Sequence, residues 1–150
     1  MNSYFIDTSA LVKRYIAEIG SEWIQLLTDP DVNNKIIVSR ITWIEMLSAF
    51  SRLKRENAID NNIFDAVIQS FEFDWYTQYH IVEFDKSLSH HAGRLVKKYP
   101  LRAYDSVQLA SALRIQKIMT NNSLIFVSSD IRLLKVAQNE RLQNENPLVK

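Results

Sequence analysis

Short apolar runs that end in polar residues recur along the chain, and segments with helical spacing separate them. The runs predict strands at residues 4–6, 35–38, 80–84 and 124–127. The intervening segments predict helices at residues 9–15, 22–27, 41–57, 62–75, 86–98, 103–117 and 131–140. Because helices separate the strands, each connection must be a crossover and the sheet is expected to be mainly parallel.

Within the helical segments, apolar residues recur every three or four positions and mark the faces expected to pack on the core. The two longest stripes are Trp43, Leu47, Phe50 and Leu53, and Ile63, Val67 and Phe71. Asp85 and either Asp60 or Asn61 are expected as N-caps. The tail from Gln143 to Lys150 is weakly patterned, and a fifth strand near Leu148 is a conjecture. The predicted fold class is therefore α/β, with four to five strands.

Composition is that of one ordinary globular domain. The 150 residues include only two glycines and three prolines, with no repeat or linker, so we expect residues 1–150 to form a single domain. There is no cysteine, which excludes disulfides, thiolate nucleophiles and cysteine-ligated zinc. No apolar run approaches the length of a membrane span, and the first run is too short for a signal peptide. We expect a cytoplasmic protein with no membrane partner.

Four acidic residues carry the chemical signal. Asp7 and Asp130 each follow a predicted strand, Glu45 lies in the helix after the second strand, and Asp105 lies in the first turn of a late helix. Parallel strands bring such residues to one edge of a sheet, where ligands bind in open α/β folds. Carboxylates that lie close together repel one another, and a bound divalent cation would neutralise this repulsion. Oxygen ligands select Mg²⁺ or Mn²⁺, which activate water for attack on a phosphodiester.

Each of these acids also has a purely structural interpretation. An aspartate after a strand commonly caps a helix, a glutamate on a helix is commonly solvated, and Asp105 could complement the helix dipole while pairing with Arg102. Arg102 is equally a candidate for a phosphate contact. Ser9 and Ser128 could hydrogen-bond the carboxylates or the phosphate, or could cap helices.

The formal net charge of +1 depends on what the acids do. Setting four site carboxylates aside from the 17 acidic residues leaves 13, against 18 lysines and arginines. The rest of the surface would then be distinctly basic, which suits a polyanion such as RNA.

With these residues in place, the chain resembles the PIN-domain ribonucleases, most closely the VapC-like toxins of bacterial and archaeal toxin-antitoxin modules. The resemblance runs from Tyr4 to about Leu142. It rests on Phe5-Ile6-Asp7-Thr8-Ser9-Ala10-Leu11-Val12, on Ser39 to Glu45, on Leu101-Arg102-Ala103-Tyr104-Asp105-Ser106-Val107-Gln108-Leu109-Ala110 and on Phe126-Val127-Ser128-Ser129-Asp130-Ile131-Arg132-Leu133. The third block is the most specific.

The resemblance implies a three-layer α/β/α sandwich and an Mg²⁺- or Mn²⁺-dependent endoribonuclease. It places the metal-binding, catalytic acids at Asp7, Glu45, Asp105 and Asp130. It also implies a homodimer and a cognate antitoxin protein. The chain departs from the family after the last helix, where such toxins often have a glycine and this chain has Glu140-Arg141-Leu142.

Two other functions compete with the nuclease. One is a catalytically silent PIN module that binds RNA or a protein partner, which the presence of all four acids disfavours. The other is a receiver-type or haloacid-dehalogenase-like phosphotransfer domain. The dehalogenase pattern requires an aspartate two positions after Asp7, where this chain has Ser9, and a receiver requires an acidic pair where Asp7 stands alone.

Overall fold

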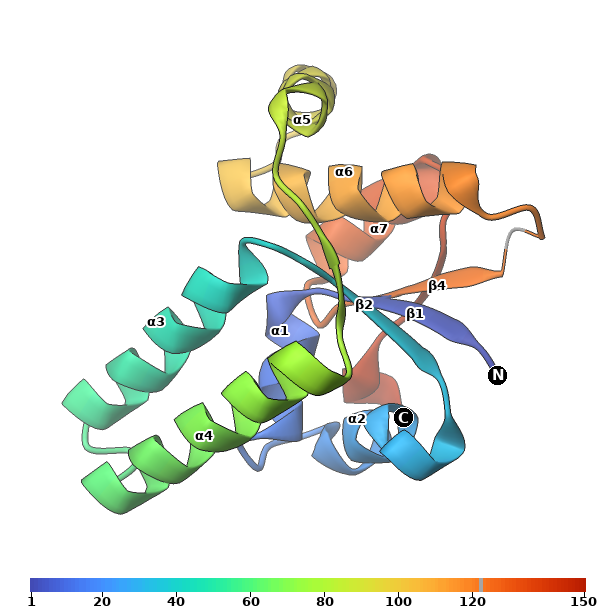
Figure 1. Cartoon of the computed structure of the whole chain (residues 1–150). Helices are drawn as coiled ribbons and strands as arrows, with labels where there is room; N and C mark the ends of the chain where they lie inside the picture. Colours follow the sequence, from blue (N-terminus) through green and yellow to red (C-terminus); the bar gives the residue numbers. More distant parts are fainter. Residues whose placement is uncertain (122) are drawn as a thin grey trace.

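The computed structural model describes residues 1–121 and 123–150. Figure 1 shows helices gathered on both sides of one sheet. Strands (β), α-helices (α) and short 3-10 helices (η) follow in the order β1 (Ser3–Ile6), α1 (Thr8–Leu11), η1 (Val12–Arg14), α2 (Ser21–Thr28), η2 (Pro30–Val32), β2 (Lys35–Ser39), α3 (Thr42–Arg55), α4 (Asn61–Thr77), β3 (His80–Val82), α5 (Lys86–Lys98), α6 (Ala103–Ile118), β4 (Leu124–Val127), α7 (Ile131–Asn139), β5 (Gln143–Glu145) and η3 (Pro147–Val149).

The described residues form one five-stranded sheet in the order β3-β2-β1-β4-β5, and every neighbouring pair of strands is parallel. The chain builds outward from β1 through β2 to β3, then crosses to the other side of β1 for β4 and β5. The strand order therefore reverses between β1 and β4. At such a point the connections leave in opposite directions and open a crevice at the carboxyl ends of the strands. In Figure 1 the strands end toward the left, where α1, α3 and α6 begin.

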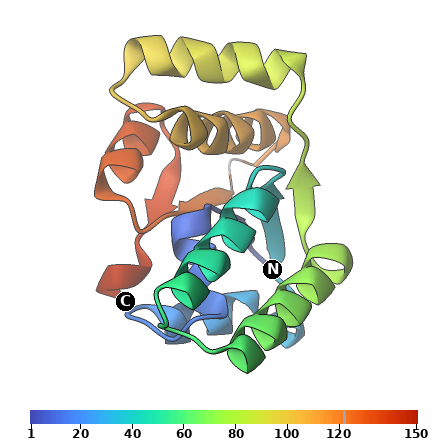
Figure 2. The same ribbon diagram turned by 90° about the vertical axis from the view of Figure 1, so that its left-hand side faces the viewer.

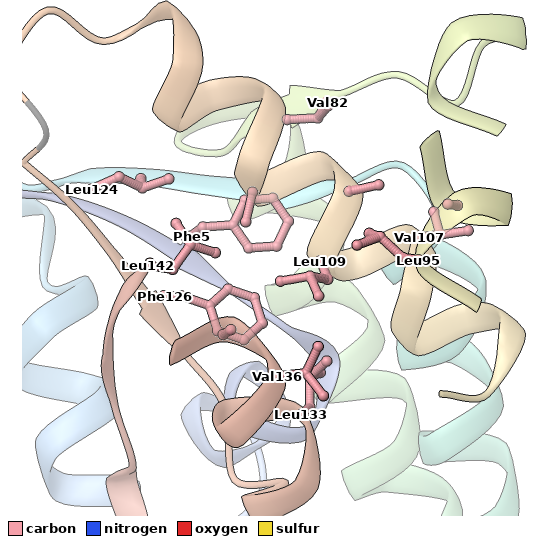
Figure 3. Packing of buried hydrophobic residues seen from close by; sticks show 14 of the residues in the cluster. Phe5, Val82, Leu95, Val107, Leu109, Leu124, Phe126, Leu133, Val136 and Leu142 are labelled. Atoms are coloured by element: carbon pink, nitrogen blue, oxygen red, sulfur yellow. The ribbon is translucent and has the colours of Figure 1, made fainter. Parts of the chain in front are cut away.

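Successive residues of the central strands face opposite sides of the sheet, which makes two cores. On one side, Phe5 and Phe126 stack with ring centroids 5.8 Å apart and pack with residues of α5, α6 and α7. Figure 3 shows these rings beside Leu109 and Leu133. On the other side, Ile6 packs with residues of α1, α2, α3 and α4. The sheet is therefore buried on both faces, as its near-continuous apolar strands require.

The predicted three-layer α/β/α sandwich with a parallel sheet is confirmed. Figure 2 shows α3 and α4 on one side of the sheet, and α6 on the other with α5 outside it. None of the helices in the described residues is long and apolar enough to cross a membrane.

The helix caps were predicted correctly, and the α4 stripe was right for Val67 and Phe71 but wrong for Ile63. Asp60 accepts a hydrogen bond from the Ile63 amide, and Asp85 accepts one from the Leu88 amide. Ile63, predicted to face the core, is 47% exposed, while Val67 is buried. The reason is that Ile63 lies in the first turn of α4, beyond the reach of the sheet.

The first helix is shorter than predicted. The segment 9–15 was expected to be one helix, but it divides into α1 and η1, and the chain then loops to Gly20. Gly20 has φ of +92°, and a Cβ there would lie 2.6 Å from the Pro147 carbonyl oxygen. The positive φ and this close approach explain why a glycine stands immediately before α2.

The fifth strand was predicted in the wrong place. It is β5, formed by Gln143–Glu145, and the region near Leu148 is the 3-10 helix η3. The edge strand is polar and partly exposed, so it lacks the apolar alternation on which the prediction relied. Pro147, which has no N–H to donate, begins η3.

Candidate active site

Asp7 follows β1 directly and is buried, with 4% of its surface exposed. Its Oδ1 accepts hydrogen bonds from the Ala10 amide at 3.2 Å and from Ser9 Oγ at 2.7 Å, and its Oδ2 accepts one from Ser128 Oγ at 2.7 Å. Asp7 is thus both the N-cap of α1 and a site residue. The structural and functional interpretations of this residue are compatible.

The two serines tie β1 to β4 around this carboxylate. Ser9 Oγ accepts from the Ser129 amide, and Ser128 Oγ accepts from the Asp130 amide, each at 3.0 Å. Each hydroxyl therefore accepts a hydrogen bond from a backbone amide and donates one to the Asp7 carboxylate. The predicted carboxylate contacts of both serines are present, while a contact with phosphate stays a prediction.

Burial dominates the electrostatics of Asp7. It raises the pKa of Asp7 from 3.8 to about 7, although the hydrogen bonds from Ser9, Ser128 and Ala10 act in the opposite direction, and the charge of Glu45 raises it further. A carboxyl group with this pKa is only about half ionised at neutral pH, and a nearby cation would favour its ionised form.

Glu45 points into the same region from the first turn of α3. Its Oε1 accepts hydrogen bonds from Thr8 Oγ1 at 3.0 Å and from Gln108 Nε2 at 2.8 Å. Burial raises the pKa of Glu45, the two donors lower it, and the charge of Asp105 raises it again. Glu45 is therefore held by α1 and α6 as well as by its own helix, and is not the solvated helix residue of the alternative interpretation.

Gln108 is the residue that the sequence analysis missed. It is 2% exposed, and its Nε2 lies within hydrogen-bonding distance of Thr8, Thr42 and Glu45, while its Oε1 has no partner among the described residues. One signal was present in the sequence. Gln108 lies three positions after Asp105 on the same helix, so both project from one face of α6.

Asp105 and Asp130 complete the group of acids, and both lie near the guanidinium of Arg102. Arg102 Nε lies 3.3 Å from Asp105 Oδ2, and Arg102 Nη2 lies 3.9 Å from Asp130 Oδ2. Asp130 Oδ1 also accepts from the amides of Arg132 and Leu133 and so caps α7. Burial raises the pKa of Asp105, Arg102 lowers it and Asp130 raises it. The Arg102 side chain is 84% exposed, which leaves it free to move.

All four predicted acids line one pocket of about 170 Å³, together with Thr8, Ser9, Arg102 and Gln108. Its ligands would all be oxygen atoms, a donor set that fits Mg²⁺ or Mn²⁺. In residues 1–121 and 123–150, no three carboxylate or imidazole side chains stand close enough together to enclose an ion as they are placed. Asp105 and Asp130 face Arg102 instead, so closing the set around an ion requires their side chains to turn.

The sequence model of the PIN domain matches residues 4–139. The chain belongs to the PIN domain family. The matched region contains all four predicted acids, although their catalytic and metal-binding roles stay predictions.

Among relatives of this PIN domain is ribonuclease VapC45 of Mycobacterium tuberculosis (strain CDC 1551 / Oshkosh). It is 29% identical over 114 residues, which cover 74% of this chain and 75% of the relative. Two solved structures share the fold. VapBC2 from Rickettsia felis, bound to a DNA fragment from its promoter, aligns with a TM-score of 0.64 at 18% identity over 96% of this chain and 98% of the other. FitAcB from Neisseria gonorrhoeae aligns with a TM-score of 0.67 at 15% identity over 96% and 97%.

Proposed function

We propose that this PIN domain is a metal-dependent endoribonuclease that hydrolyses RNA phosphodiester bonds, and that it is the toxin of a toxin-antitoxin pair. The observation that carries the proposal is the convergence of Asp7, Glu45, Asp105 and Asp130, from four separate elements, on one pocket where the strand order reverses. The relative named as a ribonuclease supports the choice of RNA as substrate.

In this proposal, Asp7, Glu45, Asp105 and Asp130 hold one or two Mg²⁺ or Mn²⁺ ions. Such an ion supplies a water nucleophile at neutral pH and charge stabilisation on the phosphate. The protein's own groups position the reaction. Ser9 and Ser128 fix both oxygens of Asp7, and Thr8 and Gln108 fix Oε1 of Glu45.

Proton transfer and substrate binding fall to two further groups. Glu45 would accept a proton from the attacking water through Oε2, because Oε1 already accepts hydrogen bonds from Thr8 and Gln108. Arg102 would leave Asp105 and Asp130 when the cation binds, and its guanidinium would then contact the phosphate.

Substitution of two acids tests the activity. Asp7→Asn and Asp105→Asn are each expected to abolish Mg²⁺- or Mn²⁺-dependent cleavage of single-stranded RNA while circular dichroism stays that of the folded protein. Asp65→Asn, at an exposed position on α4, is the control and keeps full activity. Cleavage retained in both site variants would refute the proposal.

The competing function is a catalytically silent module that binds RNA or a protein. Isothermal titration with Mn²⁺ separates the two, because the nuclease must bind the ion and the silent module need not. We expect wild-type protein to bind Mn²⁺ and Asp7→Asn to bind it much more weakly.

The partners and setting belong to the same proposal. A cognate antitoxin and a homodimer are expected, with the whole of residues 1–150 as one domain in the cytoplasm. The solved relatives include VapBC2 and FitAcB, which support the antitoxin. Co-purification with the small protein encoded by the neighbouring gene, and loss of RNA cleavage in that complex, test it. Light scattering of the isolated chain tests the homodimer.

A further inference from the structure

The acid pocket shares part of its wall with a larger groove beside α3. This groove has a volume of about 390 Å³, and Thr8 and Glu45 line both it and the acid pocket. Its remaining wall includes Ile41 and Ile44. Ser48 and Ala49, which follow Glu45 by one turn, are small and leave the space open. A nucleotide joined to a phosphate at the acids would therefore pass directly into the groove.

Two exposed side chains give the groove its chemical character. Ile44 on α3 is 69% exposed and Tyr104 in the first turn of α6 is 64% exposed, although both line a concave surface. Nucleobases in single-stranded RNA complexes stack on flat aromatic rings, and an aliphatic side chain beside the ring adds apolar contact with the base. Arg52, which has no ion pair among the described residues, adds a cation to the lining of the groove.

The opening on the other side of the acids is different. It has a volume of about 360 Å³ and carries two arginines, Arg102 and Arg132, beside Asp105 and Asp130. Paired guanidinium groups suit phosphate oxygens rather than a base. The two flanks of the acid pocket thus match the two chemical parts of a nucleotide chain.

We propose that the groove of Ile41, Ile44, Arg52 and Tyr104 is a nucleobase subsite that reads the base next to the scissile phosphate. The base stacks on Tyr104 and contacts Ile44, and Arg52 contacts the next phosphate. This inference rests on the proposed ribonuclease function and adds to it a site of base preference. The shared lining by Thr8 and Glu45 and the cation of Arg52 favour RNA over a protein side chain as the occupant.

Variants of the ring test the subsite. Loss of one stacked base costs roughly a 5- to 150-fold change in equilibrium or rate. We therefore expect Tyr104→Ala to lower kcat/KM on short single-stranded oligoribonucleotides by that factor and to weaken the base preference around mapped cleavage sites in a long RNA. Tyr104→Phe keeps the stacking face and should behave like wild type. Ile44→Ala should give a smaller loss of the same kind.

Phe73→Ala is the matched control, because Phe73 is a similarly exposed aromatic residue on α4 and does not line the groove. It should leave rate and cleavage sites unchanged. If Tyr104→Ala cuts at the same sites and rate as wild type, the subsite is refuted while the nuclease stands. If the variant cuts normally but escapes inhibition by the antitoxin, the groove is a protein dock and the proposal is also refuted. A wild-type chain that cuts no RNA would refute the proposed function itself.

Discussion

At the scale of single residues, the acid site is built on carboxylates that the fold partly buries. Asp7 is the extreme case, since its pKa is raised to about 7. Between pH 4 and 7 the cation-free folded protein holds a proton on Asp7 that the unfolded chain has already lost. Folding stability must therefore fall as the pH rises through this window.

This leads to a prediction for Asp7→Asn in the presence of a chelator. The wild-type free energy of unfolding should decrease from pH 4 to above pH 7, and the difference between wild type and variant should change by up to about 4 kcal/mol, at about 1.4 kcal/mol for each unit of pKa shift. Urea denaturation at several pH values measures it. If the free energies of unfolding of the two proteins change with pH in the same way, ionisation of Asp7 does not lower the stability of the fold.

Gln108 is predicted to act on cleavage through Glu45. Gln108→Leu removes one of the two donors that stabilise the Glu45 carboxylate, so the pKa of Glu45 should rise and the acidic limb of the pH–rate profile should move to higher pH. The rate at neutral pH should fall by roughly 10- to 100-fold, the usual cost of losing a group that orients a metal ligand. Gln116→Leu, the same change farther along α6, should leave the profile unmoved. An unchanged profile in Gln108→Leu would contradict the role.

The positions of the four acids at one pocket could be predicted where one local pattern sufficed, while their metal-binding and catalytic roles stay predictions. Asp7 was predicted because it directly follows an apolar strand, and Asp130 because it follows a strand and two serines. Glu45 was predicted because it lies in the helix after the second strand, and Asp105 because it lies in the first turn of a late helix. Gln108 was missed because its partners, Thr8 and Thr42, are 100 and 66 residues away. Only the folded arrangement of α1, α3 and α6 brings them together.

At the scale of elements, the end of α7 shows how the chain manages without the family's usual glycine. Arg141 has φ of +64°, its amide donates to the Gln138 carbonyl, and the Leu142 amide donates to the Ala137 carbonyl. This pattern is a Schellman cap, whose left-handed residue is commonly glycine. The helix therefore ends in this turn although the chain has Arg141 and not glycine there, which leaves a side chain in the left-handed region.

Arg141→Gly should accordingly stabilise the protein by about 0.5–1 kcal/mol, since it removes the left-handed strain but adds freedom to the unfolded chain. Arg141→Ala removes the same side chain but keeps the Cβ, and should give no such gain. Thermal or urea denaturation measures both. Equal effects of the two substitutions would locate the cause in the arginine side chain instead.

A second element-level feature is the buried ion pair that ties η1 to α4. Arg14 lies 3.3 Å from Asp74, and both side chains are at most 15% exposed. Tyr15 Oη also donates to Asp74 at 2.7 Å, and Arg14 donates to the hydroxyl of Tyr79 at 2.9 Å. No sequence pattern signalled this network, because its members are some 60 residues apart.

Asp74→Ala should destabilise the fold by about 3 kcal/mol or more, because it leaves Arg14 buried without its counter-ion. The comparison is Glu83→Ala, which breaks the exposed Arg40–Glu83 pair and should change stability little. Both are measured as free energies of unfolding. Equal effects would mean that burial does not set the strength of these pairs.

At the scale of the whole molecule, strand order decides where the chemistry lies. Alternating strands and helices predicted a parallel sheet. The order β3-β2-β1-β4-β5 could not be predicted, because the apolar strands have similar sequences and nothing in them specifies which strand pairs with which. That order places β1 beside β4 and so brings Asp7 next to Ser128 and the loop of Asp130. The site is therefore a consequence of topology as much as of sequence motifs.

The central claim is that these four carboxylates hold a divalent cation. It is tested most directly by an anomalous-scattering map from crystals of the protein grown with Mn²⁺. We predict a peak within about 2–2.6 Å of carboxylate oxygens of Asp7 and at least one other of the four acids, with Arg102 displaced from Asp105. A map that shows no peak at saturating Mn²⁺, with Arg102 still paired to Asp105 and Asp130, would contradict the account.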